Sequence, residues 1–225
     1  MRPISFRLRG WESWPSGHKA EKAGLIPTLL RRRVTSVGQQ ALSSAWHLPE
    51  TAHARLILSS RHGECSRTAS LLESAISKSD LSPADFTLSV HHALLGLLSI
   101  AHKNNRGHTA VASGQESFCY GLLEAAACAK EMPDELIVLV HFDDLLPPPF
   151  SMFNEPAEQP IALALALAAT GEGVPLQFTS ECSSTGNAPS VSHAQDFLNF
   201  INDGLPECVS VGEHRKWRWT RYALD

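Results

Sequence analysis

Residues 86–118, FTLSVHHALLGLLSIAHKNNRGHTAVASGQESF, decide the fold, because their pattern predicts an extended segment, a helix, a turn and a strand in this order. The first five residues predict an extended segment. The apolar run over about residues 92–102 predicts a buried helix that begins with two histidines. The polar turn around Gly107 and the run over about residues 108–113 predict a second short strand. Such alternation of strand and helix is typical of an α/β sheet.

The segments before and after this stretch extend the alternation. Ile4, Phe6 and Leu8 alternate with polar residues, which predicts a half-buried strand. Two short apolar runs, ARLILSS (54–60) and ELIVLV (135–140), are typical of strands buried on both faces. Helical spacing and helix-forming composition predict helices within residues 25–48, from an N-cap at Ser66 through Ile76, and over residues 117–132.

The last third predicts more strands and one helix. IALALALAA (161–169) and PLQFTS (175–180) predict two strands joined as a hairpin, and SHAQDFLNFIN (192–202) predicts a helix capped by Ser192. KWRWTRYAL (216–224) predicts an exposed edge strand with Trp217 and Trp219 on one face. The prolines of residues 147–160 exclude regular structure there. The predicted fold class is α/β: one mixed, mostly parallel sheet with helices on both faces, plus extra C-terminal antiparallel strands.

Composition limits the possible functions. The chain has 225 residues, of which 43% are hydrophobic and 19% charged, so we expect one globular domain. Nineteen Lys and Arg against 23 Asp and Glu give a net charge of −4. A weakly acidic chain has no field for holding a polyanion, so we expect no nucleic-acid partner.

The spacing of the cysteines and the length of the apolar runs indicate in which cellular compartment the protein is expected. The five cysteines lie far apart without a Cys-x-x-Cys pair, which favours a reducing cytoplasm. The first residues lack the apolar core of a signal peptide. The longest apolar run, PIALALALAA, is about half as long as a membrane-spanning helix. We therefore expect a cytoplasmic protein without an integral membrane segment.

Several motifs resemble catalytic or metal sites without completing them. The acids that follow ELIVLV would need a Gly-rich loop ending in Gly-Lys-Ser/Thr to bind a nucleotide, and VASGQES has its serine and glycine in the wrong order for a hydrolase elbow. A metal set of His91, His92, His141 and Asp143 is disfavoured because adjacent histidines on a helix point about 100° apart. We expect no metal and no cofactor.

Cys65, in RHGECSRT, is predicted close to a helix N-terminus beside His62 and two arginines, a setting that can favour a thiolate. No acid or second base is recognisable around it, so a structural cysteine is the preferred interpretation. The basic, aromatic end EHRKWRWTRY is interpreted as an edge strand rather than as a nucleic-acid site.

Residues 86–125 resemble the centre of the N-terminal half of β-ketoacyl synthases, which have the thiolase fold. In that family a strand runs into a tight turn that carries the nucleophilic cysteine. A buried helix, a Gly-containing turn and a strand that ends in small residues follow. Here the helix over residues 94–101, the turn at Gly107 and HTAVASG (108–114) come in the same order.

The wider chain resembles the single-half β-ketoacyl synthase chain-length factors of aryl-polyene-type pathways. Their SVHNA-like segment is similar to SVHHA (89–93), and their Tyr-Asp-Leu-Pro strand end is similar to HFDDLLPPPF (141–150). The resemblance covers about residues 4–150. It implies a single thiolase-like domain over residues 1–225, with a core of about 4–150 and extra strands and a helix over 151–225.

The departures from this family concern catalysis. A gapless comparison places His91, next to His92, at the nucleophile position. A helix N-terminus stabilises a thiolate but not an imidazolium, and an imidazole does not form the stable thioester that condensation needs. Complete synthases also carry their decarboxylating histidines, or histidine and asparagine, in a C-terminal half that the 225 residues do not include. We therefore expect no catalysis by this chain alone. A purely structural role for His91 remains equally open.

The resemblance implies a non-catalytic chain-length-factor-like subunit that forms a heterodimer with a complete β-ketoacyl synthase. The interface strand would comprise His108, Thr109, Ala110, Val111, Ala112, Ser113 and Gly114. Its small side chains allow close approach, and an unpaired apolar edge is a liability in a monomer. The acyl tunnel would be lined by Leu94, Leu95, Leu98, Phe118 and Leu122. An acyl carrier protein would dock mainly on the catalytic subunit.

Two other functions stay open at this point. One is a free-standing acyl-transfer enzyme or hydrolase that uses His62, His91 or His92 together with Cys65 or a serine. The other is a carrier-protein or lipid-binding module without a ketosynthase partner.

Overall fold

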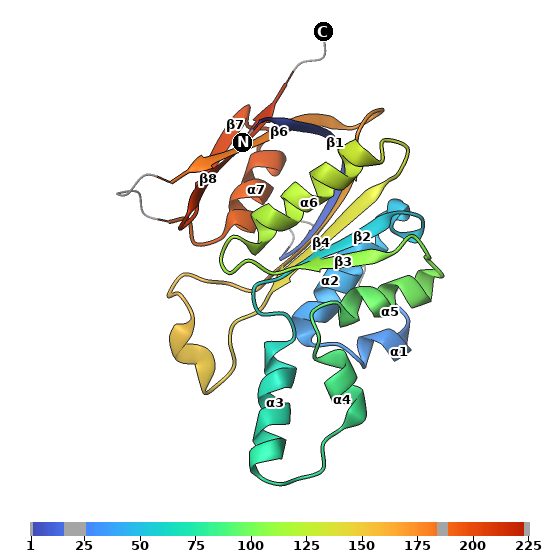
Figure 1. Ribbon diagram of the computed structural model, residues 1–225, viewed down its shortest axis with the longest axis vertical. Coiled ribbons are helices and arrows are strands. Elements are labelled where there is room, and N and C mark those ends of the chain that lie inside the picture. The colour runs from blue at the N-terminus through green and yellow to red at the C-terminus, as the bar shows by residue number, and fades with distance from the viewer. Residues whose placement is uncertain (1, 16–25, 184–188, 223–225) are drawn as a thin grey trace.

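An eight-stranded mixed sheet crosses the molecule in the computed structural model, which describes residues 2–15, 26–183 and 189–222 (Figure 1). The strand order is β3-β2-β4-β5-β1-β6-β8-β7. The strands are β1 (Ile4–Trp14), β2 (Arg55–Ser59), β3 (His108–Val111), β4 (Ile137–Asp143), β5 (Ile161–Ala168), β6 (Val174–Cys182), β7 (Glu207–Val211) and β8 (Arg215–Arg221). The helices are α1 (Thr28–Arg31), α2 (Ser36–Trp46), α3 (Cys65–Ile76), α4 (Pro83–Leu88), α5 (Ala93–His102), α6 (Ser117–Glu131) and α7 (His193–Asn202), with 3₁₀ turns η2 (Pro49–Ala52) and η3 (Phe150–Phe153).

The predicted mixed sheet with helices on both faces and added antiparallel strands is confirmed. The parallel part is smaller than predicted, because only the β2–β3 and β2–β4 pairs are parallel. The other five pairings are antiparallel. Two of these five pairings belong to β1, which lies between β5 and β6 and runs antiparallel to both.

Two hydrophobic clusters lie on opposite faces of the sheet. One packs α6 and α7 against the sheet, and the other packs α2 and α5 against it. The alternating sequence of β5 serves both clusters, since its leucines point into the first and its alanines into the second. All eight residues of β5 are buried, because helices cover the strand on both faces of the sheet.

Three predictions about strand neighbours or helix starts are wrong. The hairpin between β5 and β6 does not form, because β1 separates them. β8 is an inner strand, since β7 pairs with it and provides the edge. Helix α3 begins at Cys65 with Glu64 at its N-cap position instead of Ser66. The predicted common face of Trp217 and Trp219 is confirmed, because both side chains are fully buried against the α6–α7 side.

The predicted extended segment before the central helix is also wrong. Residues Pro83–Leu88 form helix α4, in which Pro83 stands at the first helical position. The Ser82 side chain accepts a hydrogen bond from Asp85 N at 3.2 Å and caps the helix. Helix α5 and strand β3 follow at the predicted positions.

Among the described residues, every helix is too short or too polar to span a lipid bilayer.

Candidate functional site

Polar side chains gather where β2 and β4 end and α6 begins. Strand β2 ends at Ser59, and residues 60–64 lead from it into α3. Arg61, Gln115, His141 and Asp143 line a small cavity there, together with Phe118, Glu158, Gln159, Ile161, Val191, Ser192 and Ala194. Its volume of about 30 Å³ has room for one or two water molecules but not for an acyl chain.

Asp143 holds the loop that follows β2. Its Oδ1 accepts hydrogen bonds from Arg61 N at 2.6 Å, His62 N at 3.4 Å and Ser60 Oγ at 3.1 Å. Burial raises the pKa of Asp143 to about 6, although these hydrogen bonds favour the charged form. The carboxyl group thus serves to order this loop.

The ordered loop places Gly63 directly beneath His91. Gly63 has φ +55°, and a Cβ at this position would lie 3.1 Å from Cδ2, Cε1 and Nδ1 of the His91 ring. His91 is half-buried in the turn before α5, and its Nε2 is buried without a hydrogen-bond partner. A structural role for His91 through a hydrogen bond from Nε2 is therefore not observed. Burial lowers the pKa of the neighbouring His62, and Arg61 lowers it further.

Ser59, His141 and Asp143 have the order of a hydrolase triad. Ser59 Oγ lies 3.0 Å from His141 Nδ1, and His141 Nε2 lies 3.5 Å from Asp143 Oδ2. Ser59 is completely buried, however, and Gly121 of α6 packs so closely on it that an added Cβ would come within 2.5 Å. Burial also lowers the pKa of His141 to about 4. A substrate cannot reach this serine, so the three residues form a structural network.

The strand, tight turn and buried helix that the resemblance associates with the nucleophile occur at β3, residues 112–116 and α6. Gly114 adopts φ +58° in this turn, and nine of the fifteen residues of α6 are buried. Gln115 and Glu116 stand last before the helix. His91 follows helix α4 instead of a strand, so the context on which its assignment as the nucleophile position was based is not found there.

The Glu116 side chain makes structural hydrogen bonds. It is 4% exposed, and its Oε1 accepts hydrogen bonds from His214 N and Arg215 N, each at 3.1 Å. Gly212 leaves the space for this carboxylate, because a Cβ there would come within 2.1 Å of Oε1. The residue therefore joins the start of α6 to the β7–β8 turn, a function that its place in the sequence did not reveal.

None of the cysteines whose pKa departs from its ordinary value is activated as a thiolate. All five cysteines are free, and burial raises the pKa of Cys65, Cys119, Cys128 and Cys208. Cys65 at the start of α3 therefore has the opposite of the thiolate-favouring setting that its sequence could provide.

The five predicted tunnel residues are not brought together. Leu94, Leu95 and Leu98 pack in the α2–α5 cluster, whereas Phe118 and Leu122 pack in the α6–α7 cluster across the sheet. All five are at most 1% exposed. A single wall made from this set does not exist within the chain.

The predicted interface residues lie at an edge of the sheet. Strand β3 pairs only with β2 among the described strands. Its four residues are half-buried, and Ala112, Ser113 and Gly114 after it are exposed. The His108 ring at its start lies 5.9 Å from the ring of His92, which is the exposed N-cap residue of α5.

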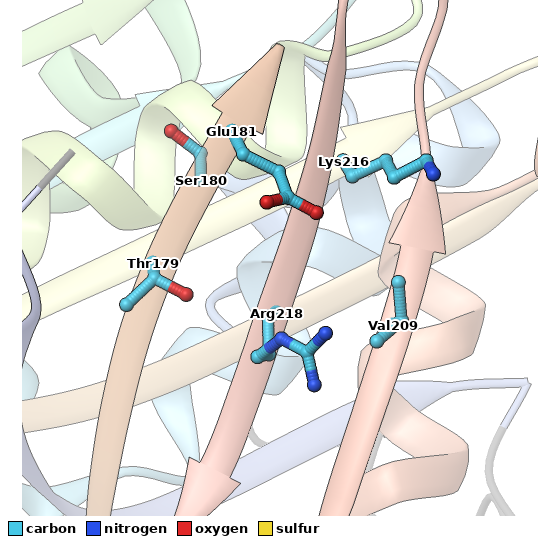
Figure 2. Close-up of a pocket in the computed structure, with 6 residues that line it drawn as sticks. All are labelled: Thr179, Ser180, Glu181, Val209, Lys216 and Arg218. Atoms are coloured by element: carbon cyan, nitrogen blue, oxygen red, sulfur yellow. The ribbon is translucent and has the colours of Figure 1, made fainter. Parts of the chain in front are cut away.

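The remaining polar groups that the structure describes form structural contacts or line a surface cavity. Within residues 2–15, 26–183 and 189–222, no three His, Cys, Asp or Glu side chains could hold a metal ion together. A buried network missed from sequence joins α7 to β7: Ser210 Oγ donates to Asp196 Oδ2 at 2.5 Å and lies 2.6 Å from His193 Nδ1. A cavity of about 270 Å³ lies at β6, β8 and β7. Its lining residues are Thr179, Ser180, Glu181, Val209, Lys216 and Arg218 (Figure 2). Arg218 there pairs with Glu207.

Comparison with known proteins identifies the fold. A search of curated proteins gave no match. A chain of the ketosynthase (ApeO) in complex with its chain length factor (ApeC) from Xenorhabdus doucetiae is similar, with TM-score 0.81 and 24% identity over 97% of this chain and 100% of that chain.

Two other solved structures are similar over most of the chain. The ishigamide ketosynthase/chain length factor gives TM-score 0.61 and 10% identity, over 80% of this chain and 67% of that one. AntDE:AntF, a type II PKS acyl-carrier protein in complex with its ketosynthase bound to the hexaketide, gives TM-score 0.57 and 12% identity, over 89% and 74%. The fold is the thiolase-like ketosynthase fold.

The sequence pattern described as "Beta-ketoacyl synthase, N-terminal domain" matches residues 8–220. The match continues well beyond residue 150, where the resemblance described above ended. It covers both clusters of the core, the turn before α6 and the strands of the last third. The chain therefore belongs to the β-ketoacyl synthase N-terminal domain family.

Proposed function

We propose that this chain is a non-catalytic, chain-length-factor-like subunit that forms a heterodimer with a complete β-ketoacyl synthase. The observation that carries the proposal is the turn before α6. In the family the nucleophilic cysteine stands in such a turn, whereas here Gln115 and Glu116 occupy it and the Glu116 carboxylate is bound to His214 N and Arg215 N. An amide has no nucleophilic pair comparable to a thiolate, and a carboxylate held in this way cannot turn towards a substrate.

The position of β3 supports the proposed mode of assembly. Strand β3 leaves one side of its backbone without a strand partner among the described strands, and Ala112, Ser113 and Gly114 carry no bulky side chains. Pairing with the corresponding strand of the synthase would satisfy this edge. The residues from His108 to Gly114 remain our proposed interface strand.

The burial of the predicted tunnel residues changes the proposed way in which chain length is limited. The leucines of α5 and the side chains of Phe118 and Leu122 fill two separate cores, and the cavity beside Gln115 holds about 30 Å³. We therefore propose that this chain closes the end of the partner's acyl tunnel from outside. The substrates would be acyl groups of fatty-acid- or polyketide-type synthesis, in an aryl-polyene-type pathway. They would be delivered by an acyl carrier protein that docks mainly on the synthase.

Co-expression with a complete ketosynthase from the same organism tests the proposal. Light scattering coupled to gel filtration should show a stable 1:1 complex, whereas the chain alone should self-associate. His91→Ala should assemble normally and leave condensation by the complex largely intact, while replacement of the partner's cysteine should abolish it. A monodisperse chain that does not bind the synthase, or an assembled His91→Ala complex without turnover, would overturn the proposal.

A further inference from the structure

Helices α3 and α4 form a hairpin that projects away from the sheet, which we call the arm (residues 64–90). Figure 1 shows the two helices side by side below the body of the molecule, and they contact each other. Ala69 is the only buried residue of α3, and α4 has none. Since most helices in proteins are stabilised by burying an apolar face, the arm lacks the usual source of helix stability.

The arm instead displays apolar side chains to solvent. Ile76 is 82% exposed and Phe86 is 69% exposed, and three further side chains are 43–51% exposed: Leu72, Leu81 and Val90. Covering these five would remove on the order of 500 Å² of apolar surface, more than half of the ~800 Å² per partner in a standard interface. An apolar area of this size equals the largest patch of a typical monomer, and such patches often mark interaction sites, so the arm has the character of a contact surface.

Arg67 fixes the direction of the arm. Its guanidinium pairs with Asp85 of α4, donates to Arg33 O at 2.9 Å and lies 3.6 Å from Glu64 Oε2. The side chain is 15% exposed, so these contacts are partly shielded from water. One arginine therefore joins α3 to α4 and to the turn after α1, which orders the arm before any partner binds.

The arm is continuous with the edge of the sheet. Val90 at its end is followed by His91 and by His92, whose ring lies 5.9 Å from the His108 ring at the start of β3. Its charged residues (Glu64, Arg67, Glu73, Lys78, Asp80 and Asp85) include more acids than bases. An apolar surface with an acidic excess fits an apolar protein surface and does not fit an anionic lipid or nucleic acid.

We propose that the arm is a second contact surface for the ketosynthase partner in addition to the β3 edge, and that Ile76 and Phe86 act as its apolar anchors. This inference rests on the proposed function and adds to it a named surface. Each anchor is large, mostly exposed in the free chain and carried on a helix that the contacts of Arg67 order in advance, so binding would cover apolar surface at a low ordering cost.

The test measures the affinity of this chain for the ketosynthase by biolayer interferometry. The double variant Ile76→Asp/Phe86→Asp should bind at least tenfold more weakly than wild type. The matched control is Met152→Asp/Phe153→Asp, because these side chains are 77% and 63% exposed on η3, outside the arm. The control should stay within twofold of wild type. Arg67→Met, which leaves both anchors in place, should slow association.

Three outcomes overturn the inference. In the first, wild type binds the synthase and the arm variant, folded by circular dichroism, binds equally well, which leaves the proposed function intact. In the second, the arm variant loses only self-association, so that the arm contacts a second copy of this chain. In the third, wild type does not bind the synthase, and the proposed function fails first.

Discussion

Replacing Gly121 with alanine tests how closely α6 packs on the sheet. The new Cβ would lie 2.5 Å from Ser59 Cβ, 2.7 Å from Ser59 Oγ and 3.2 Å from Leu139 Cδ1. Ser59 Cβ is attached directly to the backbone of β2 and cannot rotate away. Overpacking of this kind costs about 1–3 kcal/mol, and disturbing the 3.0 Å contact between Ser59 and His141 adds roughly 1 kcal/mol. Alanine regains about 1 kcal/mol of helix propensity, so we expect a net loss of about 2 kcal/mol.

Gly96→Ala is the matched control. Gly96 lies inside α5, and a Cβ there would meet nothing within 4 Å. This variant should gain about 0.5–1 kcal/mol, because only the propensity term remains. Urea unfolding followed by tryptophan fluorescence at low micromolar concentration should move the midpoint of Gly121→Ala down by ~0.5–1 M and that of Gly96→Ala up. A rise in both midpoints would refute the close packing of α6 on β2.

Three further predictions use the same polar cluster and the cysteines. Gly63→Ala should cost about 1–2 kcal/mol because of its positive φ and the His91 ring, and less in a His91→Ala background; an equal cost in both backgrounds in urea unfolding would contradict the contact. Burial lowers the pKa of His141 from 6.5 to about 4, so between these pH values the unfolded chain binds the additional proton and stability should rise with pH. In wild type Asp143 opposes this trend, because its pKa is raised from 3.8 to about 6 and the folded chain binds the additional proton. In Asp143→Asn this opposing trend is absent, so from pH 4 to 6.5 the free energy of unfolding of the variant should rise by up to about 3 kcal/mol more than that of wild type. A difference between the two urea midpoints that does not change with pH would contradict this prediction. Iodoacetamide should alkylate the native chain first at the exposed Cys182, as peptide mapping would show, and earlier alkylation of a buried cysteine would argue against the fold.

The local elements could largely be predicted from the sequence, because their signals lie within a few residues. The apolar runs of β2 and β4 indicated strands buried on both faces, and the structure confirms this burial. The Leu-Ala alternation of β5 indicated a strand, but its burial on both faces was not predicted. The position of β1 could not be predicted in this way. Alternation of Ile4, Phe6 and Leu8 indicates a half-buried strand but carries no information about strands more than 150 residues away.

The segment before α5 shows a competition between two local signals. Phe86, Thr87 and Val90 favour a strand by propensity, yet Ser82 and Pro83 provide a helix N-cap and first turn, and the cap decides the structure. Because a strand was predicted before His91, the nucleophile position was also assigned to His91. With α4 before His91, the strand and tight turn of the family are found at β3 and α6, more than twenty residues later.

The site contacts depend on residues far apart in the chain. The loop after β2 is ordered by Asp143, about eighty residues later, and the turn before α6 by backbone groups at His214 and Arg215. A carboxylate beside a strand end is visible in the sequence, but its hydrogen-bond donors are main-chain amides without a side-chain signature. Such contacts become apparent only when the sheet order is known.

The central claim is that the partner supplies the nucleophile, and intact-mass spectrometry of the assembled complex tests it most directly. After treatment with an electrophilic acyl probe, we predict one adduct per synthase subunit and an unchanged mass for this chain. A stoichiometric adduct on this chain, retained when the partner's cysteine is replaced, would contradict the account.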